Sequence, residues 1–222
     1  MKFNILTLFP EMIETYCGFS ILKRAVNSGV LKINTINPRD FTHDKHKKVD
    51  DTPYGGGAGM VLKVEPYVEA YESIKMGKNS ITVMLSPQGQ KLEENLVKKL
   101  AQYDEITLLC GHYEGFDERI RDIIKPIEIS IGDFVLTGGE LPALCLIDAV
   151  SRKIEGTLGK MESADTDSFA NGRLEFPQYT KPREFRGYKV PEVLLNGNHK
   201  EIEAFRENES LKRTNEKRPD LL

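Results

Sequence analysis

Short apolar runs recur along this chain, each followed by a turn of small residues and then by an amphipathic stretch. Residues 80–85, 106–110 and 127–131 are apolar runs of strand length, whereas residues 91–103 and 116–124 carry apolar side chains at helical spacing. Strands that alternate with helices in this way favour an α/β fold with a parallel sheet. We therefore predict repeated strand–turn–helix units in the middle of the chain.

The N-terminal part extends this pattern. It adds two predicted strands, residues 2–8 and 31–37, and two predicted helices, residues 20–28 and 65–73. Residues 38–59 between them are polar and glycine-rich, and a loop of that length inside a compact domain tends to be functional. Its glycines fit neither the GxxxxGK[ST] nor the GxGxxG pattern of nucleotide-binding loops. We predict a mobile loop that contacts a large substrate.

The C-terminal part differs in composition. A predicted helix over residues 140–152 is apolar nearly all round, which predicts burial in the core or against a second subunit. Residues 159–172 are small, polar and acidic, as is typical of a linker. Residues 173–222 include a charged helix and are too few for a large core of their own. We expect a domain of residues 1–158, a linker, and a small, mostly helical C-terminal domain.

Glycine-rich turns follow the three predicted strands of the middle region. They span residues 86–89, 111–115 and 132–139. The carboxyl ends of adjacent parallel strands meet at one edge of the sheet, which is where open α/β sheets bind small molecules. Glycine permits tight turns and lets a ligand approach backbone N–H groups. The sequence therefore predicts a small-molecule site formed by these turns.

Composition narrows the class of protein. The chain has 222 residues, of which 39% are hydrophobic and 29% charged, as in ordinary soluble globular proteins. The N-terminal apolar run is too short for a signal peptide and no run is long enough to span a membrane, so we expect a cytoplasmic protein. The spacing of the three cysteines argues against zinc and disulfides. Cys110 and Cys145 are predicted to be small core residues.

The net charge of −3 argues against general binding of polyanions. Basic residues nevertheless cluster, and such clusters are typical both of solvated surface and of a local RNA-binding face. The clusters are Lys45, Lys47 and Lys48; Lys181, Arg183, Arg186 and Lys189; and Lys212, Arg213, Lys217 and Arg218.

A set of short motifs in one order resembles the bacterial tRNA (guanine-N1)-methyltransferases, the TrmD family of the knotted SPOUT methyltransferases. The resemblance covers nearly the whole chain, and the ordered set is specific although each motif alone is weak. The motifs are LFPEM at 8–12, PRDFTHD at 38–44, VDD at 49–51, PYGGG at 53–57, LSPQG at 85–89, Gly111 with YEG at 113–115, SIGD at 130–133, GGELP at 138–142, DSF at 167–169, and VLL at 193–195 with GNH at 197–199.

The resemblance implies a SPOUT-type parallel sheet with a deep trefoil knot, in which the turns hold S-adenosyl-L-methionine. Sequence pattern alone would not suggest a knot, because knotted chains are rare. Phe134 stands where tyrosine is common in the family, which puts one polar contact in doubt. The implied cofactor-binding residues are Leu85, Ser86, Pro87, Gly111, Tyr113, Glu114, Gly115, Ile131, Gly132, Asp133, Phe134, Val135, Leu136, Gly138, Gly139 and Pro142.

The implied reaction is transfer of a methyl group to N1 of the guanosine 3′-adjacent to the anticodon, tRNA position 37. Guanine N1 carries a proton, so the reaction needs a base and a group that stabilises charge on O6. The family pattern implies Asp167 as the base and Arg152 as the stabilising cation. Burial or the acidic neighbours Glu162 and Asp165 should raise the pKa of Asp167. The residues alone favour other roles, an N-cap in the linker for Asp167 and a cation at a helix C-terminus for Arg152. It is the family match that favours the catalytic roles.

The family also implies partners. It functions as a homodimer with shared active sites, in which the linker and C-terminal domain of one subunit close on the knot of the other. The tRNA anticodon stem–loop is the expected substrate, and Mg²⁺ dependence is expected, although no residue cluster identifies a metal site. The implied substrate-binding residues are Asp50, Gly57, Gly59, Lys181 and Arg183.

Two alternatives remain open at this stage. A knotted enzyme that methylates a ribose 2′-hydroxyl would not need a base for guanine N1, so Asp167→Asn would barely change its rate. A non-catalytic RNA-binding dimer would bind tRNA without methyl transfer. A Rossmann-type enzyme is disfavoured because GxGxxG and its acidic partner are missing.

Overall fold

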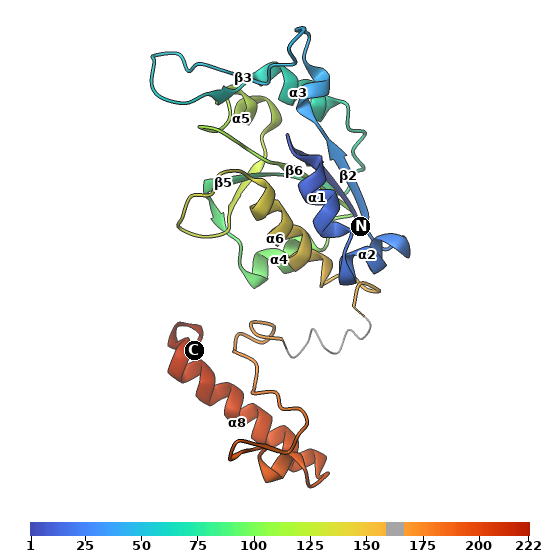
Figure 1. Ribbon diagram of the computed structural model, residues 1–222, viewed down its shortest axis with the longest axis vertical. Helices are drawn as coiled ribbons and strands as arrows, with labels where there is room; N and C mark the ends of the chain where they lie inside the picture. The colour runs from blue at the N-terminus through green and yellow to red at the C-terminus, as the bar shows by residue number, and fades with distance from the viewer. Residues whose placement is uncertain (159–166) are drawn as a thin grey trace. The chain divides into compact units, whose positions relative to one another are not determined.

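The computed structural model describes residues 1–158 and 167–222 (Figure 1). The chain forms two compact units, Met1–Gly159 and Lys160–Leu222. Most of the predicted linker, including Glu162 and Asp165, lies outside the described residues.

A five-stranded sheet forms the centre of the first unit. All its neighbouring strands are parallel, in the order β2-β1-β6-β5-β7. The predicted α/β class with a parallel sheet is therefore confirmed. The strands are β1 Lys2–Leu6, β2 Lys32–Ile36, β5 Ser80–Lys91, β6 Glu105–Leu109 and β7 Ile127–Ser130.

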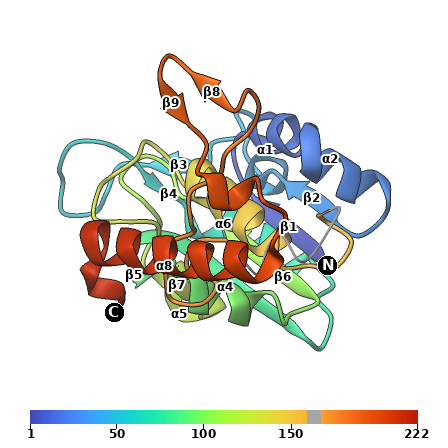
Figure 2. The ribbon, with the colours of Figure 1, turned by 90° about the horizontal axis from the view of Figure 1, so that it is seen from below.

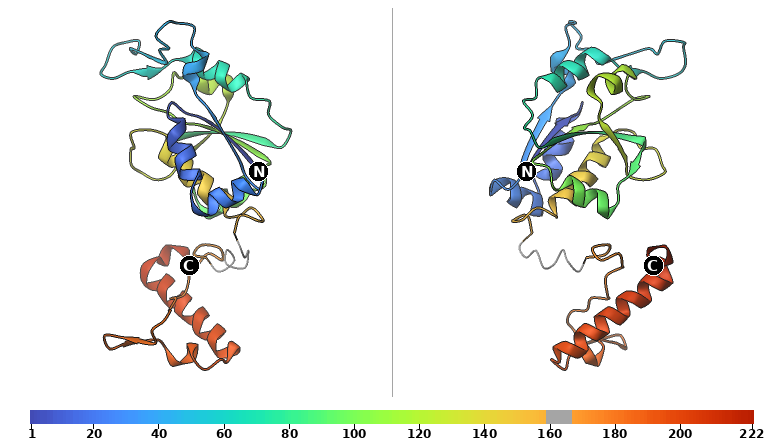
Figure 3. Two further views of the ribbon diagram at one scale, coloured as in Figure 1. Left: turned by 45° about the vertical axis from the view of Figure 1, so that its right-hand side comes forward. Right: turned by 180° about the vertical axis from the view of Figure 1, so that it is seen from behind.

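Helices cover both faces of the sheet, as the views in Figure 3 show. Side chains alternate along each strand, so that Phe3 and Ile5 of β1 pack on one face and Leu6 on the other. The first face packs against α1 Pro10–Cys17, α2 Ser20–Asn27, α4 Glu94–Leu100 and α6 Glu140–Ser151. The second face packs against α3 Val64–Glu72 and α5 Arg119–Ile124.

Several boundaries differ from the sequence-based expectations. Helix α1 was not predicted. It begins at Pro10, and proline is well placed in the first turn of a helix, where its missing N–H costs nothing. Strand β5 continues beyond Leu85 with a register shift between Leu85 and Gln90, where a turn was expected. The prediction that Cys145 lies in the core is wrong, since it is exposed on α6.

The glycine-rich segment contains little regular structure. A 3₁₀ turn, Pro38–Phe41, opens it, and β3 Asp50–Asp51 pairs antiparallel with β4 Val61–Leu62. The long loop is therefore a hairpin anchored on β4.

The second unit is dominated by one long helix, α8 His199–Lys217. Strands β8 Glu184–Phe185 and β9 Tyr188–Lys189 form a small hairpin that projects away from α8 (Figure 2). Two 3₁₀ turns, Glu192–Leu194 and Pro219–Leu221, flank the long helix. No helix within the described residues has the length and apolar character needed to cross a membrane.

Candidate active site

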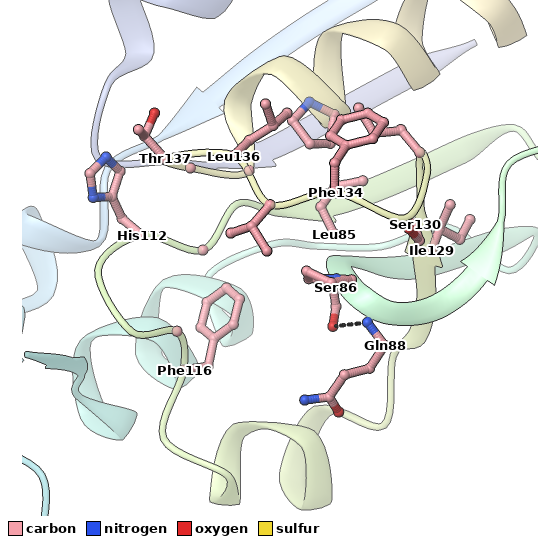
Figure 4. Close-up of a pocket in the computed structure, with 18 of the residues that line it drawn as sticks. Leu85, Ser86, Gln88, His112, Phe116, Ile129, Ser130, Phe134, Leu136 and Thr137 are labelled. Atoms are coloured by element: carbon pink, nitrogen blue, oxygen red, sulfur yellow. Dashed lines mark hydrogen bonds between the residues drawn. The ribbon is translucent and has the colours of Figure 1, made fainter. Parts of the chain in front are cut away.

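A cavity of about 290 Å³ opens at the carboxyl ends of β6 and β7, beside residues 85–88 in the middle of β5. Its walls are residues 85–88 of β5, the end of β7, the segments that follow β6 and β7, and the start of α6. Figure 4 shows the side chains of Leu85, Phe116 and Phe134 gathered around this space. The cavity size lies at the lower end of the range of small-molecule sites, and its mixed wall of backbone and apolar side chains is typical of them.

The structure brings together nearly all the residues implied to bind cofactor. Asp133 is the exception: its side chain is 79% exposed and accepts a hydrogen bond of 2.7 Å from Lys91 Nζ. The Asp133 carboxylate raises the pKa of Lys91 through this bond. The implied residues that line the cavity are Leu85, Ser86, Pro87, Gly111, Tyr113, Glu114, Gly115, Ile131, Gly132, Phe134, Val135, Leu136, Gly138, Gly139 and Pro142.

Other wall residues were missed by sequence reasoning. Gln88, His112 and Thr137 lie within the three predicted turns, so that taking whole turns instead of motif positions would have included them. The other four lie outside those turns, in β7, in α5 or just after the turn at 111–115. At the register shift within β5, Ser86 Oγ accepts a hydrogen bond of 3.2 Å from the Gln88 amide (Figure 4). The additional lining residues are Gln88, His112, Phe116, Arg121, Ile129, Ser130 and Thr137.

Close backbone contact explains the glycine at the start of α6. The Gly139 amide donates to the Gly111 carbonyl at 2.8 Å. A Cβ atom at Gly139 would lie 2.7 Å from Cys110 Cα and 2.8 Å from the Gly111 nitrogen. Any larger residue would therefore separate α6 from the turn after β6 and change the shape of the cavity.

Neutral groups lie behind the cavity. The buried Tyr67 hydroxyl donates to the Cys110 carbonyl at 3.2 Å. Burial raises the pKa of Tyr67 and the pKa of the Cys110 thiol well above their ordinary values. Neither group ionises near neutral pH, so Cys110 serves packing, as predicted, and carries no charge into the site.

The glycine-rich hairpin is joined to the same cavity. The Glu114 amide donates to the Met60 carbonyl at 3.0 Å, and the Leu62 amide donates to the Gly115 carbonyl at 2.9 Å. A Cβ atom at Gly59 would overlap the Glu114 carboxylate. Asp50 pairs with Leu62 across the hairpin. The implied substrate residues Asp50 and Gly59 are thus tied to the turn that carries Glu114.

A second cavity, of about 280 Å³, lies at the other end of α6. Arg152 follows the last residue of this helix and lines the cavity together with Tyr16, Phe19, Ser20, Ile21, Leu22, Asp148 and Thr157. Pro142 lines the first cavity, ten residues earlier on the same helix. At 1.5 Å per residue, the helix separates the two cavities of one chain by about 15 Å.

Asp167 belongs to the second unit, where polar contacts hold its segment on α8. The neighbouring Ser168 Oγ accepts from the Glu175 amide at 3.0 Å. Thr214 of α8 accepts from the Leu174 amide at 2.9 Å. Lys181 and Arg183 of this unit are exposed ahead of the β8–β9 hairpin. The described residues contain no group of three or more His, Cys, Asp or Glu side chains that could hold a metal ion.

Comparison with known proteins gives consistent matches over the whole chain. The family model described as tRNA (guanine-1)-methyltransferase TrmD matches residues 1–222. A tRNA (guanine-N(1)-)-methyltransferase of Carboxydothermus hydrogenoformans is 55% identical over 222 residues, all of this chain and 87% of the relative. The protein of the same name in Trichodesmium erythraeum is 50% identical over 223 residues and is covered to 98%.

Proposed function

The chain belongs to the tRNA (guanine-1)-methyltransferase TrmD family, and we propose that it transfers a methyl group from S-adenosyl-L-methionine to N1 of the guanosine at tRNA position 37, 3′-adjacent to the anticodon. The observation that carries this proposal is the cavity formed by residues 85–88 of β5 and by the glycine-rich segments after β6 and β7, in a chain that matches the family over its full length. We expect the enzyme to act in the cytoplasm, where its tRNA substrate is found.

The residues of the first cavity fit S-adenosyl-L-methionine. Adenine needs a narrow apolar slot with backbone donors and acceptors, and the walls combine Leu85, Ile131 and Leu136 with glycine turns. The contact between Gly139 and residues 110–111 keeps this slot narrow. When bound there, the cofactor would supply the methyl group. We further propose that the chain is knotted here as in the family, with one segment threaded through a loop formed by the others. The register shift within β5 and the close pairing of β5 with β7 are consistent with this threading.

Within this proposal Arg152 stabilises the charge that develops on guanine O6, and Asp167 removes the proton from N1. Guanidinium stays charged and presents planar donors, which suit a carbonyl oxygen. Asp167 would have to approach the base from the second unit, to which its segment is attached through Ser168 and Leu174. Binding of tRNA to that unit would then deliver the base to the reaction, a conformational step that precedes chemistry.

The distance between the two cavities supports a site shared between subunits. Reacting atoms must approach to about 3–3.5 Å, far less than the roughly 15 Å that α6 puts between Pro142 and Arg152 in one chain. Leu141 is 50% exposed, and it shares one face of α6 with the exposed Cys145; Met12 of the adjacent α1 is 43% exposed. Two such faces packed about a two-fold axis, with the α6 helices antiparallel, would bring Arg152 of one subunit to the first cavity of the other.

The tRNA would contact both units. Lys181 and Arg183 are exposed and suit backbone phosphates of the anticodon stem. The hairpin that carries Asp50, Gly57 and Gly59 is joined to Glu114 and suits a neighbouring nucleotide. Mg²⁺ remains an expectation from the family alone: the described residues offer it no ligand set, and we assign it no step.

Methyl transfer to defined transcripts tests the proposal. Labelled S-adenosyl-L-methionine is incubated with tRNA transcripts that carry guanosine or adenosine at position 37, using wild-type enzyme and Asp167→Asn. We expect 1-methylguanosine only with the guanosine transcript, and a rate lower by about 10²–10⁴ in the variant, as is typical for loss of a general base. Label on a ribose, or a variant as active as the wild type, would contradict the assigned chemistry.

A further inference from the structure

We propose that the second cavity, beside Arg152, is the pocket for the acceptor guanine, and that Asp148 determines specificity by accepting a hydrogen bond from the exocyclic N2 amine. This inference rests on the proposed function and deepens it by naming the group that reads the base.

The shape and lining of this cavity suit a flat purine. Two aromatic side chains, Tyr16 at 46% exposure and Phe19 at 67%, contribute to its wall and offer stacking surfaces. Thr157 is only 4% exposed, and its hydroxyl has no hydrogen-bond partner among the residues described. An orphaned buried hydroxyl at a cavity wall is a group that a polar ligand can satisfy.

Asp148 is held in one orientation. The Tyr16 hydroxyl donates to Asp148 Oδ2 at 2.9 Å. The same hydrogen bond raises the pKa of Tyr16, so the phenol keeps its proton and remains a donor. Within the described part of the chain, no hydrogen bond is made by the other carboxylate oxygen, Oδ1. One carboxylate oxygen is thus fixed by the protein and the other is left for a ligand.

Guanine matches these two charged groups along one edge. Its O6 is an acceptor, N1 carries a proton, and N2 carries two donor hydrogens, in that order. Arg152 can only donate and suits O6, whereas the Asp148 carboxylate can only accept and suits N2. N1 then lies between the two contacts, open to the methyl donor and to Asp167. Adenine presents an amine where Arg152 needs an acceptor, and no donor at C2, so both contacts would be lost.

Inosine isolates the proposed contact because it keeps O6 and the N1 proton and lacks only the N2 amine. We would measure kcat/KM for methylation of transcripts with guanosine or inosine at position 37, using wild type, Asp148→Ala and Tyr16→Phe. A hydrogen bond to a charged group corresponds to about 10- to 100-fold. We expect the wild type to prefer guanosine by that factor, Asp148→Ala to reduce the preference to within a few-fold of unity, and Tyr16→Phe to give an intermediate ratio.

The ratio of kcat/KM for guanosine to kcat/KM for inosine shows whether Asp148 reads the base or only supports the structure. A variant that merely disturbs folding or dimerisation loses activity on both transcripts and keeps the wild-type ratio, and that result would overturn the inference. Equal use of guanosine and inosine by the wild type would overturn it as well. In both cases the wild-type enzyme would still form 1-methylguanosine, so the proposed function would stand. If the wild type methylates neither guanosine nor inosine at N1, the proposed function itself fails. Glu72→Ala, an exposed acidic residue of α3, is the matched control and should change neither rate.

Discussion

The two units differ in how they are stabilised. The first buries apolar side chains on both faces of its sheet, among them Phe3, Ile106 and Leu108 with no exposed surface. In the described part of the second, Thr214 is the only buried residue. The first unit can therefore specify its fold through a hydrophobic core. The second depends on polar contacts around one helix and on contacts with a binding partner.

Polar and cation–π contacts take the place of a core in the second unit. Arg206 lies over the Phe176 ring at 4.8 Å, a contact worth about 0.5–1 kcal/mol where it is exposed. Ser210 Oγ donates to the Leu174 carbonyl at 2.6 Å, and Thr214 Oγ1 accepts from the Leu174 amide. Such contacts fix a segment on a helix and stabilise it only modestly. The difference predicts a rigid body that forms the first cavity and an adaptable body that carries Asp167.

A matched pair of substitutions, one in each unit, should give the largest difference in the free energy of unfolding. Leu108→Ala should lower the free energy of unfolding of the first unit by about 2–5 kcal/mol, because it leaves a cavity in the core. Thr214→Val should cost about 1–3 kcal/mol, through the unsatisfied Leu174 amide, and only in the second unit. Urea unfolding with hydrogen exchange resolved by unit measures both. Equal loss of protection in both units from Thr214→Val would show that they unfold together and would break the comparison.

The two units should also differ, by a smaller amount, in how much stability they lose at low pH. Burial raises the pKa of Glu105, but hydrogen bonds from Lys2, the Gly77 amide and Asn4 outweigh it and hold the pKa below its ordinary value. A lowered folded-state pKa stabilises the first unit fully above the unfolded pKa of about 4.3. That stability is lost as the pH falls from there through the lower pKa of the folded state.

Melting curves between pH 6 and pH 3 test this linkage. Glu105→Gln should be less stable than wild type at pH 6, and its stability should fall less on acidification. Asp220→Asn is the control in the second unit: Asp220 accepts from Arg218 in an exposed pair, which solvent screens, so a small change is expected. If the stability of Glu105→Gln fell with pH as steeply as that of the wild type, the acid sensitivity would have to come from other carboxylates.

Much of the fold could be predicted because the relevant signals are local. The apolar runs of β5, β6 and β7 and the apolar helix α6 indicate a parallel sheet by pattern alone. Helix α1 was missed because Phe9-Pro10 is compatible both with the end of a strand and with the start of a helix. The exposure of Cys145 could not be predicted either, since an apolar run does not say which side of a buried helix faces outward.

The site was only partly accessible from sequence. Glycine turns after strands point to a cavity, and the family motifs name most of its wall. Asp133 belongs to such a motif and yet pairs with Lys91 on the surface, because neighbouring residues of a turn point in different directions. The cavity beside Arg152 was not anticipated, since Tyr16, Asp148 and Thr157 come from separate segments and only the tertiary fold brings them together.

Complementation between inactive subunits tests most directly the claim that one active site is built from two subunits. Leu136→Glu puts a carboxylate into the first cavity at a side chain that is already 37% exposed, and Asp167→Asn removes the proposed base. Each homodimer should be inactive. A heterodimer of the two variants, purified through two different tags, should contain one intact site of the two and recover about half of the wild-type rate. A purified heterodimer no more active than its parents would show that the first cavity and Asp167 act within one chain and would contradict the shared site.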